Sequence, residues 1–289
     1  MPNPGTPILR SAYRPLAYTV DTVDLDFSLD AEATQVTNRM RCVRNLDAAA
    51  GPVVLFGDGL ELVSLTVDGV APPAGALRQT GTGFELDVDA DELVLEIVTR
   101  INPSANLTLS GLYRSRGGFY TQCEAEGFRR ITYFPDRPDV MARYTVRLEA
   151  DAATCPVLLS NGNLLETGTL PGGRHFARWE DPFPKPSYLF ALVAADLKAL
   201  ERRVEVADGD DGHEIGAIPV LVEPHDGVAR RLLDDLRLAD RDALPVARPE
   251  DDVVVADGEQ ENFFAGEGIE QQKVLQHVLA DFGIRAELA

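Results

Sequence analysis

Apolar and polar residues alternate along much of the chain up to about residue 200. In the first such segment the apolar positions are Val23, Leu25, Phe27 and Leu29, with mostly aspartates between them. Residues 36–42 alternate in the same way after a short turn. A period of two is typical of strands with one buried face, so the pattern predicts a hairpin that opens the protein.

Short runs of strand-forming residues continue beyond this hairpin. We expect strands at 53–56, 60–67, 84–88, 93–98, 144–148, 164–170 and 175–180. Turn signals such as Asp68-Gly69 separate these runs. Residues 187–193, SYLFALV, are almost entirely apolar, which indicates a strand buried on both faces. Closely spaced strands without helices between them predict an all-β sandwich or saddle for residues 1–200.

The pattern changes beyond residue 200. One more strand is predicted within residues 212–224, followed by helices at 226–239 and 274–282, where apolar residues recur at helical spacing. We therefore divide the chain into an all-β domain at 1–200, a short α/β segment at 201–240, and an acidic linker with a terminal helix at 241–289. The expected fold class is mainly β. The ending of the chain soon after the last helix predicts a truncated or composite reading frame.

Composition restricts the classes of function. The net charge of -20 argues against a partner held by phosphate contacts, so we expect no nucleic-acid partner. No apolar run is long enough to span a membrane, and the first residues lack the pattern of a signal peptide. We therefore expect a cytoplasmic protein without a membrane partner.

The metal-binding and redox-active residues are dispersed. The three cysteines lack Cys-x-x-Cys spacing, and none of the four histidines lies four residues from another. This distribution indicates reduced, buried thiols and predicts no disulfide framework and no metal site. His175 and Trp179 lie on one face of a predicted hairpin strand, so we interpret both as packing residues.

Candidate chemistry concentrates in residues 121–139, TQCEAEGFRRITYFPDRPD. If residues 121–126 are extended, Gln122, Glu124 and Glu126 lie on one face. Carboxylates that share a face repel each other, so a cation should complete the arrangement. That cation is either an arginine, with four nearby in sequence, or the amine of a ligand.

Other interpretations of this segment remain open from the residues alone. Glu124 and Glu126 are spaced for an acid/base pair, as in a glycosidase, although neighbouring arginines oppose a protonated acid. A structural ion pair of Glu126 with Arg129 or Arg130 is the simpler interpretation. Cys123 has no histidine near it in sequence, which favours a buried thiol over a nucleophile.

The same segment resembles the N-terminal domain of the bacterial aminopeptidase N family, zinc-dependent exopeptidases of the gluzincin class. The resemblance includes ARYTVRLEAD, LLSNGN and WEDPFPKPSYLFALVAADL, and extends from about Tyr13 to Leu197, more weakly to Ala239. It implies a β-saddle that lends one loop to an active site built mainly by the next domain. In that family the QCEAE motif holds the α-amino group of the substrate. The matching residues here are Gln122 and Glu124, which the resemblance implies as substrate-binding residues for a peptide N-terminus.

The catalytic motifs of that family are not found in this sequence. Its zinc chemistry requires H-E-x-x-H on a helix, whereas His213-Glu214 has no second histidine at the required spacing. The G-A-M-E-N segment is also absent, and GEQEN at 258–262 shares only its frame. We therefore expect no catalytic residue, no metal ligand and no cofactor in this chain, although the intact family carries zinc.

These observations lead to competing functional hypotheses. The first is the substrate-anchoring domain of an aminopeptidase N-type enzyme that removes N-terminal residues from peptides. On this hypothesis the chain is inactive alone and works with a separate catalytic domain. The second is a non-catalytic β-domain that serves as a binding or scaffolding module. The third is a hydrolase that uses Glu124 and Glu126.

Overall fold

The computed structural model describes residues 11, 13–206 and 213–222. The chain divides into two compact units between Ala195 and Asp196. The first unit contains strands β1 to β14, and the second contains strands β15 (Lys198–Val206) and β16 (His213–Val222). The described residues are mainly β, as the sequence predicts.

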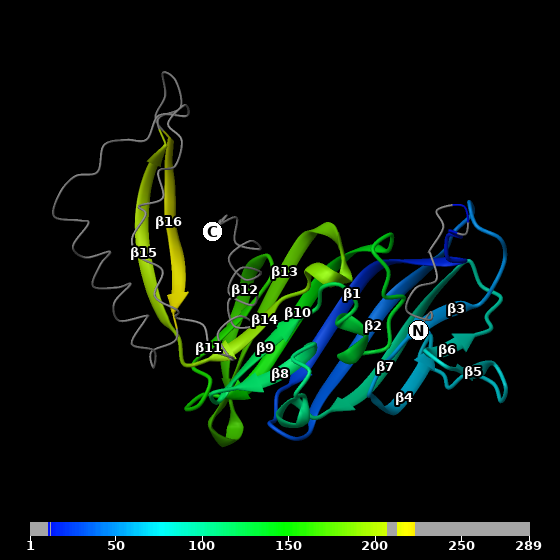
Figure 1. Cartoon of the computed structure of the whole chain (residues 1–289), viewed down its shortest axis with the longest axis horizontal. Coiled ribbons are helices and arrows are strands. Elements are labelled where there is room, and N and C mark those ends of the chain that lie inside the picture. Colours follow the sequence, from blue (N-terminus) through cyan, green and yellow to red (C-terminus); the bar gives the residue numbers. More distant parts are fainter. Residues whose placement is uncertain (1–10, 12, 207–212, 223–289) are drawn as a thin grey trace, which may run out of the picture. The chain divides into compact units, whose positions relative to one another are not determined.

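A seven-stranded sheet forms the main layer of the first unit, with strand order β12-β13-β10-β1-β2-β7-β4 (Figure 1). Its strands are β1 (Tyr18–Ser28), β2 (Thr34–Arg44), β4 (Glu61–Val67), β7 (Glu92–Ile101), β10 (Met141–Asp151), β12 (Asn163–Leu170) and β13 (Arg174–Pro186). Neighbours are antiparallel except β1 and β10, which run parallel. The predicted opening hairpin is confirmed, and it lies at the middle of this sheet.

Two smaller sheets belong to the same unit. The four-stranded sheet has the order β11-β14-β9-β8, with β8 (Gly111–Ser115), β9 (Gly118–Gln122), β11 (Val157–Ser160) and β14 (Leu192–Ala195). The three-stranded sheet has the order β3-β6-β5, with β3 (Val53–Phe56), β5 (Leu77–Thr80) and β6 (Gly83–Leu86). Short 3-10 turns lie at η2 (Pro103–Ala105), η3 (Phe128–Arg130), η4 (Pro171–Gly173) and η5 (Ser187–Leu189).

Alternation along β1 separates the two faces of the main sheet. Val23, Leu25 and Phe27 are buried on one face, each with no more than 2% of its surface exposed. Because side chains alternate across a strand, Asp24 and Asp26 lie on the opposite face. Full burial of such an apolar side chain contributes about 1.5–3 kcal/mol, so this pattern selects one register for the strand.

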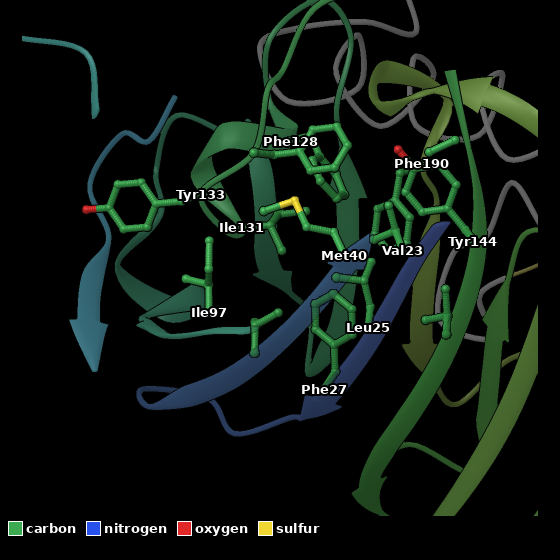
Figure 2. Close-up of a cluster of buried hydrophobic side chains, with 14 of the residues drawn as sticks. Val23, Leu25, Phe27, Met40, Ile97, Phe128, Ile131, Tyr133, Tyr144 and Phe190 are labelled. Atoms are coloured by element: carbon green, nitrogen blue, oxygen red, sulfur yellow. The ribbon is translucent and has the colours of Figure 1, made fainter. Parts of the chain in front are cut away.

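Four rings pack together next to this buried face. Phe128 meets Phe134, Tyr144 and Phe190 edge-on, with centroid distances of 5.0, 6.2 and 5.3 Å. We call these four residues the aromatic cluster. Figure 2 shows Phe128, Tyr144 and Phe190 beside the apolar side chains of β1. Phe128 begins η3, so the cluster holds this turn against the core.

The interpretation of residues 187–193 as one continuous buried strand is wrong. Ser187–Leu189 form η5, and only Leu192–Ala195 form strand β14. The Phe190 N–H donates to the Ser187 carbonyl at 3.1 Å, and the buried Ser187 hydroxyl donates to the Asp136 carboxylate. The polar contacts of Ser187 stabilise a turn that an apolar run does not reveal.

The second unit is described only as a ribbon of two strands. β15 and β16 pair antiparallel, and β16 confirms the strand predicted after residue 212. The predicted helices at 226–239 and 274–282, together with the rest of segment 241–289, lie outside the described residues. Among the residues that are described, no helix is long and apolar enough to cross a membrane.

Candidate functional site

The candidate site lies where strand β9 ends. β9 stops at Gln122, and residues 124–127 form a turn, which we call the site turn. The peptide bond between Glu124 and Ala125 is cis. The Gly127 N–H donates to the Cys123 carbonyl at 2.7 Å, and η3 begins at the next residue. The condition for placing Gln122, Glu124 and Glu126 on one face, an extended chain over residues 121–126, is therefore not met.

Gly127 allows the site turn to close tightly. A Cβ atom at this position would lie 2.3 Å from the Gln122 carbonyl oxygen and 2.9 Å from the Cys123 Cα. It would also lie 3.0 Å from the Gly111 backbone nitrogen. These neighbours are backbone atoms that cannot rotate away, so the turn in this form requires glycine.

Gln122 and Glu124 lie beside each other at the start of the site turn. The half-buried Gln122 donates from its side-chain nitrogen to the Glu124 carbonyl at 3.3 Å. The side-chain oxygen Oε1 of Gln122 is buried, and no described residue donates a hydrogen bond to it. Glu124 is exposed. The turn therefore presents a buried amide acceptor next to an exposed acidic residue.

Glu126 takes part in an ion pair. Its carboxylate lies 3.2 Å from Nη1 of Arg129, while 63% of its side chain is exposed. The structural interpretation of Glu126 is thus confirmed, with Arg129 as the partner. Because an arginine engages Glu126, the geometry offers no support for an acid/base pair of Glu124 and Glu126.

Arg129 also contacts a buried carboxylate. Its Nε and its backbone N–H donate to Oδ2 of Asp136 at 2.9 and 3.2 Å. Its Nη2 donates to the Asp136 backbone carbonyl at 2.7 Å, and its guanidinium lies 4.7 Å from the centre of the Phe56 ring. Asp136 is only 3% exposed. Burial of this carboxylate is compensated by several charge-assisted hydrogen bonds.

The other nearby arginines pair with different acids. Arg130 lies 3.4 Å from Asp58, Arg137 lies 2.7 Å from Asp139, and Arg143 lies 2.7 Å from Asp21. Arg129 differs from these three in pairing with Glu126 of the site turn. The acids and arginines of residues 121–143 are therefore several local pairs, not one cluster.

Asp136 and Ser187 were not identified as site residues from the sequence. Ser187 lies 51 residues from Asp136 along the chain, and its hydroxyl donates to the Asp136 carboxylate. No local spacing links two residues so far apart. The sequence YFPDRPD places Asp136 among prolines and an arginine, which indicates an unusual segment. It does not indicate that Ser187 is the hydrogen-bond partner of Asp136.

The cysteines and the packing residues agree with the sequence interpretation. Cys42, Cys123 and Cys155 are buried thiols outside any disulfide. Burial raises the pKa of Cys42 to about 12. His175 lies with its Nε2 atom 2.7 Å from the Cys155 carbonyl, and Trp179 is 8% exposed. Both lie on β13 as packing residues.

The described residues do not fit a zinc site. Within residues 11–206 and 213–222, no three histidine, cysteine or acidic side chains come together to hold a metal ion. His213 and Glu214 lie in strand β16, not on a helix. The GEQEN segment at 258–262 lies outside the described residues.

Much of the chain is similar to known proteins. Residues 80–189 match the model of the Peptidase M1 N-terminal domain. Aminopeptidase N from Caulobacter vibrioides is 47% identical over 230 residues, which cover 78% of this chain and 26% of the relative. Aminopeptidase N from Escherichia coli is 45% identical over 191 residues, which cover 66% of this chain and 22% of the relative. The chain thus spans about a quarter of the length of these curated relatives.

Solved structures show the same fold. Legionella pneumophila aminopeptidase A in complex with aspartic acid aligns with a TM-score of 0.69 and 32% identity, covering 80% of this chain and 27% of that chain. An M1 zinc metallopeptidase from Deinococcus radiodurans aligns with a TM-score of 0.58, covering 76% of this chain and 53% of that chain. Its identity of 17% supports the fold alone.

Proposed function

We propose that this chain, which carries a Peptidase M1 N-terminal domain homologous to part of aminopeptidase N, anchors the free N-terminus of a peptide substrate. The anchoring residues are Gln122 and Glu124. The enzyme of which it forms a part removes N-terminal residues from peptides, and this chain alone is inactive.

The observation that carries the proposal is the unsatisfied oxygen of Gln122. A buried acceptor without a donor costs about 1–3 kcal/mol, so such an atom in a folded protein calls for an explanation. Oε1 of Gln122 is buried without a donor among the described residues, and the acidic Glu124 is two residues away on the same turn. An incoming donor with a positive charge would supply the missing hydrogen bond to the Gln122 oxygen and would be attracted by the negative charge of Glu124.

The α-ammonium group of a peptide has the required chemistry. It carries three N–H donors and one positive charge, and hydrogen bonds to a carboxylate are stronger than neutral ones. Acetylation removes the charge and leaves a single donor. The pair Gln122 and Glu124 therefore selects peptides with a free N-terminus, which is the selectivity of an exopeptidase.

Bond cleavage belongs to a separate catalytic polypeptide in this proposal. The similar solved structures include M1 zinc metallopeptidases, but the described residues of this chain bring together no metal-binding group. We therefore assign the zinc and the cleavage step to that partner, and assign only recognition of the amine to Gln122 and Glu124.

Reconstitution tests this function. The chain is mixed with the part of Caulobacter vibrioides aminopeptidase N that follows its similarity to this chain, and hydrolysis of alanine p-nitroanilide is measured. We expect no turnover from either polypeptide alone and measurable turnover from the mixture. Removal of one partner of a charged hydrogen-bonded pair costs about 2–5 kcal/mol, so Glu124→Ala should lower kcat/KM at least about 30-fold.

Glu61→Ala is the matched control, because Glu61 is an exposed glutamate of strand β4 that pairs with Arg100. It should leave the restored activity unchanged. Full activity of the Glu124→Ala mixture would contradict the anchoring role. If the two polypeptides fail to associate, the alternative function of a binding or scaffolding module replaces the proposed one.

A further inference from the structure

Arg129 connects the site turn to the protein interior. On one side its Nη1 lies 3.2 Å from Glu126, the exposed acid within the turn. On the other side its Nε and Nη2 donate to the carboxylate and the backbone carbonyl of the buried Asp136, at 2.9 and 2.7 Å. A single guanidinium thus spans from the turn to a carboxylate that is 3% exposed.

We propose that Arg129, oriented by Asp136, is a positioning residue that holds Glu126 and thereby fixes the site turn in the form that binds an amine. This inference rests on the proposed anchoring function. Arg129 touches no substrate in this role. It acts by keeping Glu124 and the amide oxygen of Gln122 directed at the same ammonium group.

Contacts other than the one with Glu126 fix the orientation of the Arg129 guanidinium. The Asp136 carboxylate, the Asp136 carbonyl and the Phe56 ring each contact it, and the Ser187 hydroxyl in turn donates to Asp136. An exposed ion pair usually contributes little, because two long side chains must lose freedom to form it. Here the arginine has already lost that freedom, so its contact with Glu126 restricts the turn at a lower entropic cost.

Lysine cannot replace Arg129 in this arrangement. Three separate nitrogens of Arg129 serve the Glu126 carboxylate, the Asp136 carboxylate and the Asp136 carbonyl. The planar fork of arginine serves several acceptors at fixed angles, whereas lysine offers one nitrogen on a flexible stem. Arg129→Lys therefore keeps the charge but separates the turn from Asp136.

A purely structural role for Arg129 is the competing explanation, and the substitution Glu126→Gln distinguishes the two. Glu126 is 63% exposed at its side chain, so this change leaves the buried contacts of Asp136 intact. Glu61→Gln is the matched control, because Glu61 is 60% exposed, pairs with Arg100 at 2.8 Å, and loses the same charge. Neither change should alter the melting temperature by more than about 4 °C.

The experiment measures binding of tri-alanine and of N-acetyl-tri-alanine to the full chain by NMR titration. We expect Glu126→Gln to weaken tri-alanine binding about fivefold and to reduce the preference for tri-alanine over its acetylated form. The backbone amide signals of residues 124–127 should shift in this variant, while those of strand β1 stay in place. Arg129→Lys should weaken binding at least as much.

The outcomes separate this inference from the function on which it rests. If Glu124→Gln abolishes the preference for tri-alanine while Glu126→Gln and Arg129→Lys bind like the wild type, the positioning role is overturned and the anchor stands. If Glu124→Gln also binds like the wild type, the anchoring function fails and the inference fails with it. An equal loss of binding in Glu61→Gln would show a general charge effect and would overturn the positioning role.

Discussion

Among the single residues of the site, Gln122 matters most, because its side-chain oxygen is the proposed acceptor for the ligand. The nitrogen of the same amide donates to the Glu124 carbonyl at 3.3 Å, whereas the oxygen has no donor among the described residues. Other buried side-chain atoms of the unit also lack a partner, among them Asn38 Oδ1 and Thr132 Oγ1, but the Gln122 oxygen lies two residues from an exposed glutamate. An acceptor left open beside an acidic residue is suited to an ammonium ligand.

Gln122→Met should separate function from stability. Methionine has a similar length and removes the unsatisfied acceptor, so the free energy of unfolding should stay within about 1 kcal/mol of the wild type or rise. Affinity for tri-alanine should fall. Urea unfolding and NMR titration measure the two quantities, with Gln35→Met on the exposed surface of β2 as the control. A loss of stability above about 2 kcal/mol would show that Gln122 serves the fold instead.

Among the secondary-structure elements, strands with one buried face could be predicted from the sequence. Turns whose conformation depends on residues far away in the sequence could not. Alternation in β1, β2 and β10 predicted strands because one face of the main sheet is buried. The site turn was missed because β9 ends through the close approach of Gly127 to Cys123 and to Gly111. The turn at Ser187 was missed for the same reason, since its partner Asp136 is far away in sequence.

Gly127→Ala tests whether the site turn needs its tight form. The added methyl group would meet the Gln122 carbonyl at 2.3 Å, so the turn must shift and Gln122 must move with it. We expect a loss of tri-alanine binding and a destabilisation of about 1–3 kcal/mol, measured by titration and urea unfolding. Gly81→Ala is the control, because nothing lies within 4 Å of a Cβ atom there and its φ lies outside the positive range. Undiminished binding by Gly127→Ala would contradict a tight turn.

Glu149 on β10 provides a pH-dependent contribution to stability. It pairs with Arg174 at 2.7 Å and Arg147 at 3.2 Å. Burial raises the pKa of the Glu149 carboxyl, but hydrogen bonds from Arg174 and Arg147 outweigh burial, so the pKa lies below its ordinary value of 4.5. A carboxyl with a lowered pKa in the folded state stabilises the protein above the pKa of the unfolded state. That contribution is lost as the pH falls through the folded-state pKa.

Glu149→Gln should therefore cost about 1 kcal/mol at pH 7, and the difference from the wild type should shrink as the pH falls below about 4.5. Urea unfolding between pH 3 and pH 7 measures this difference. Glu166→Gln, at an exposed position of strand β12, is the control for the loss of one glutamate. A difference that grows on acidification would contradict the assigned ion pairs.

For the whole molecule, the described residues bring together no group of three metal-binding side chains, and the proposed function assigns them recognition of the substrate amine alone. The motifs quoted from the sequence were sufficient to identify the family resemblance from about Tyr13 to Leu197, because rare segments such as QCEAE and DPFPKP occur in order. Homology to aminopeptidase N extends over 230 residues, about a quarter of the relative from Caulobacter vibrioides. The predictions for residues 226–239 and 241–289 stay predictions, because these residues lie outside the part of the chain that the structure describes.

Binding of a peptide α-amino group beside the site turn should be visible at the Gln122 side chain itself. The side-chain amide signals of Gln122 are followed by NMR while tri-alanine, and separately N-acetyl-tri-alanine, is added to the full chain. We expect a saturable shift of these signals with tri-alanine and none with the acetylated peptide, and no shift with either peptide in Glu124→Ala. Equal shifts with both peptides, or an undiminished response of Glu124→Ala, would contradict it.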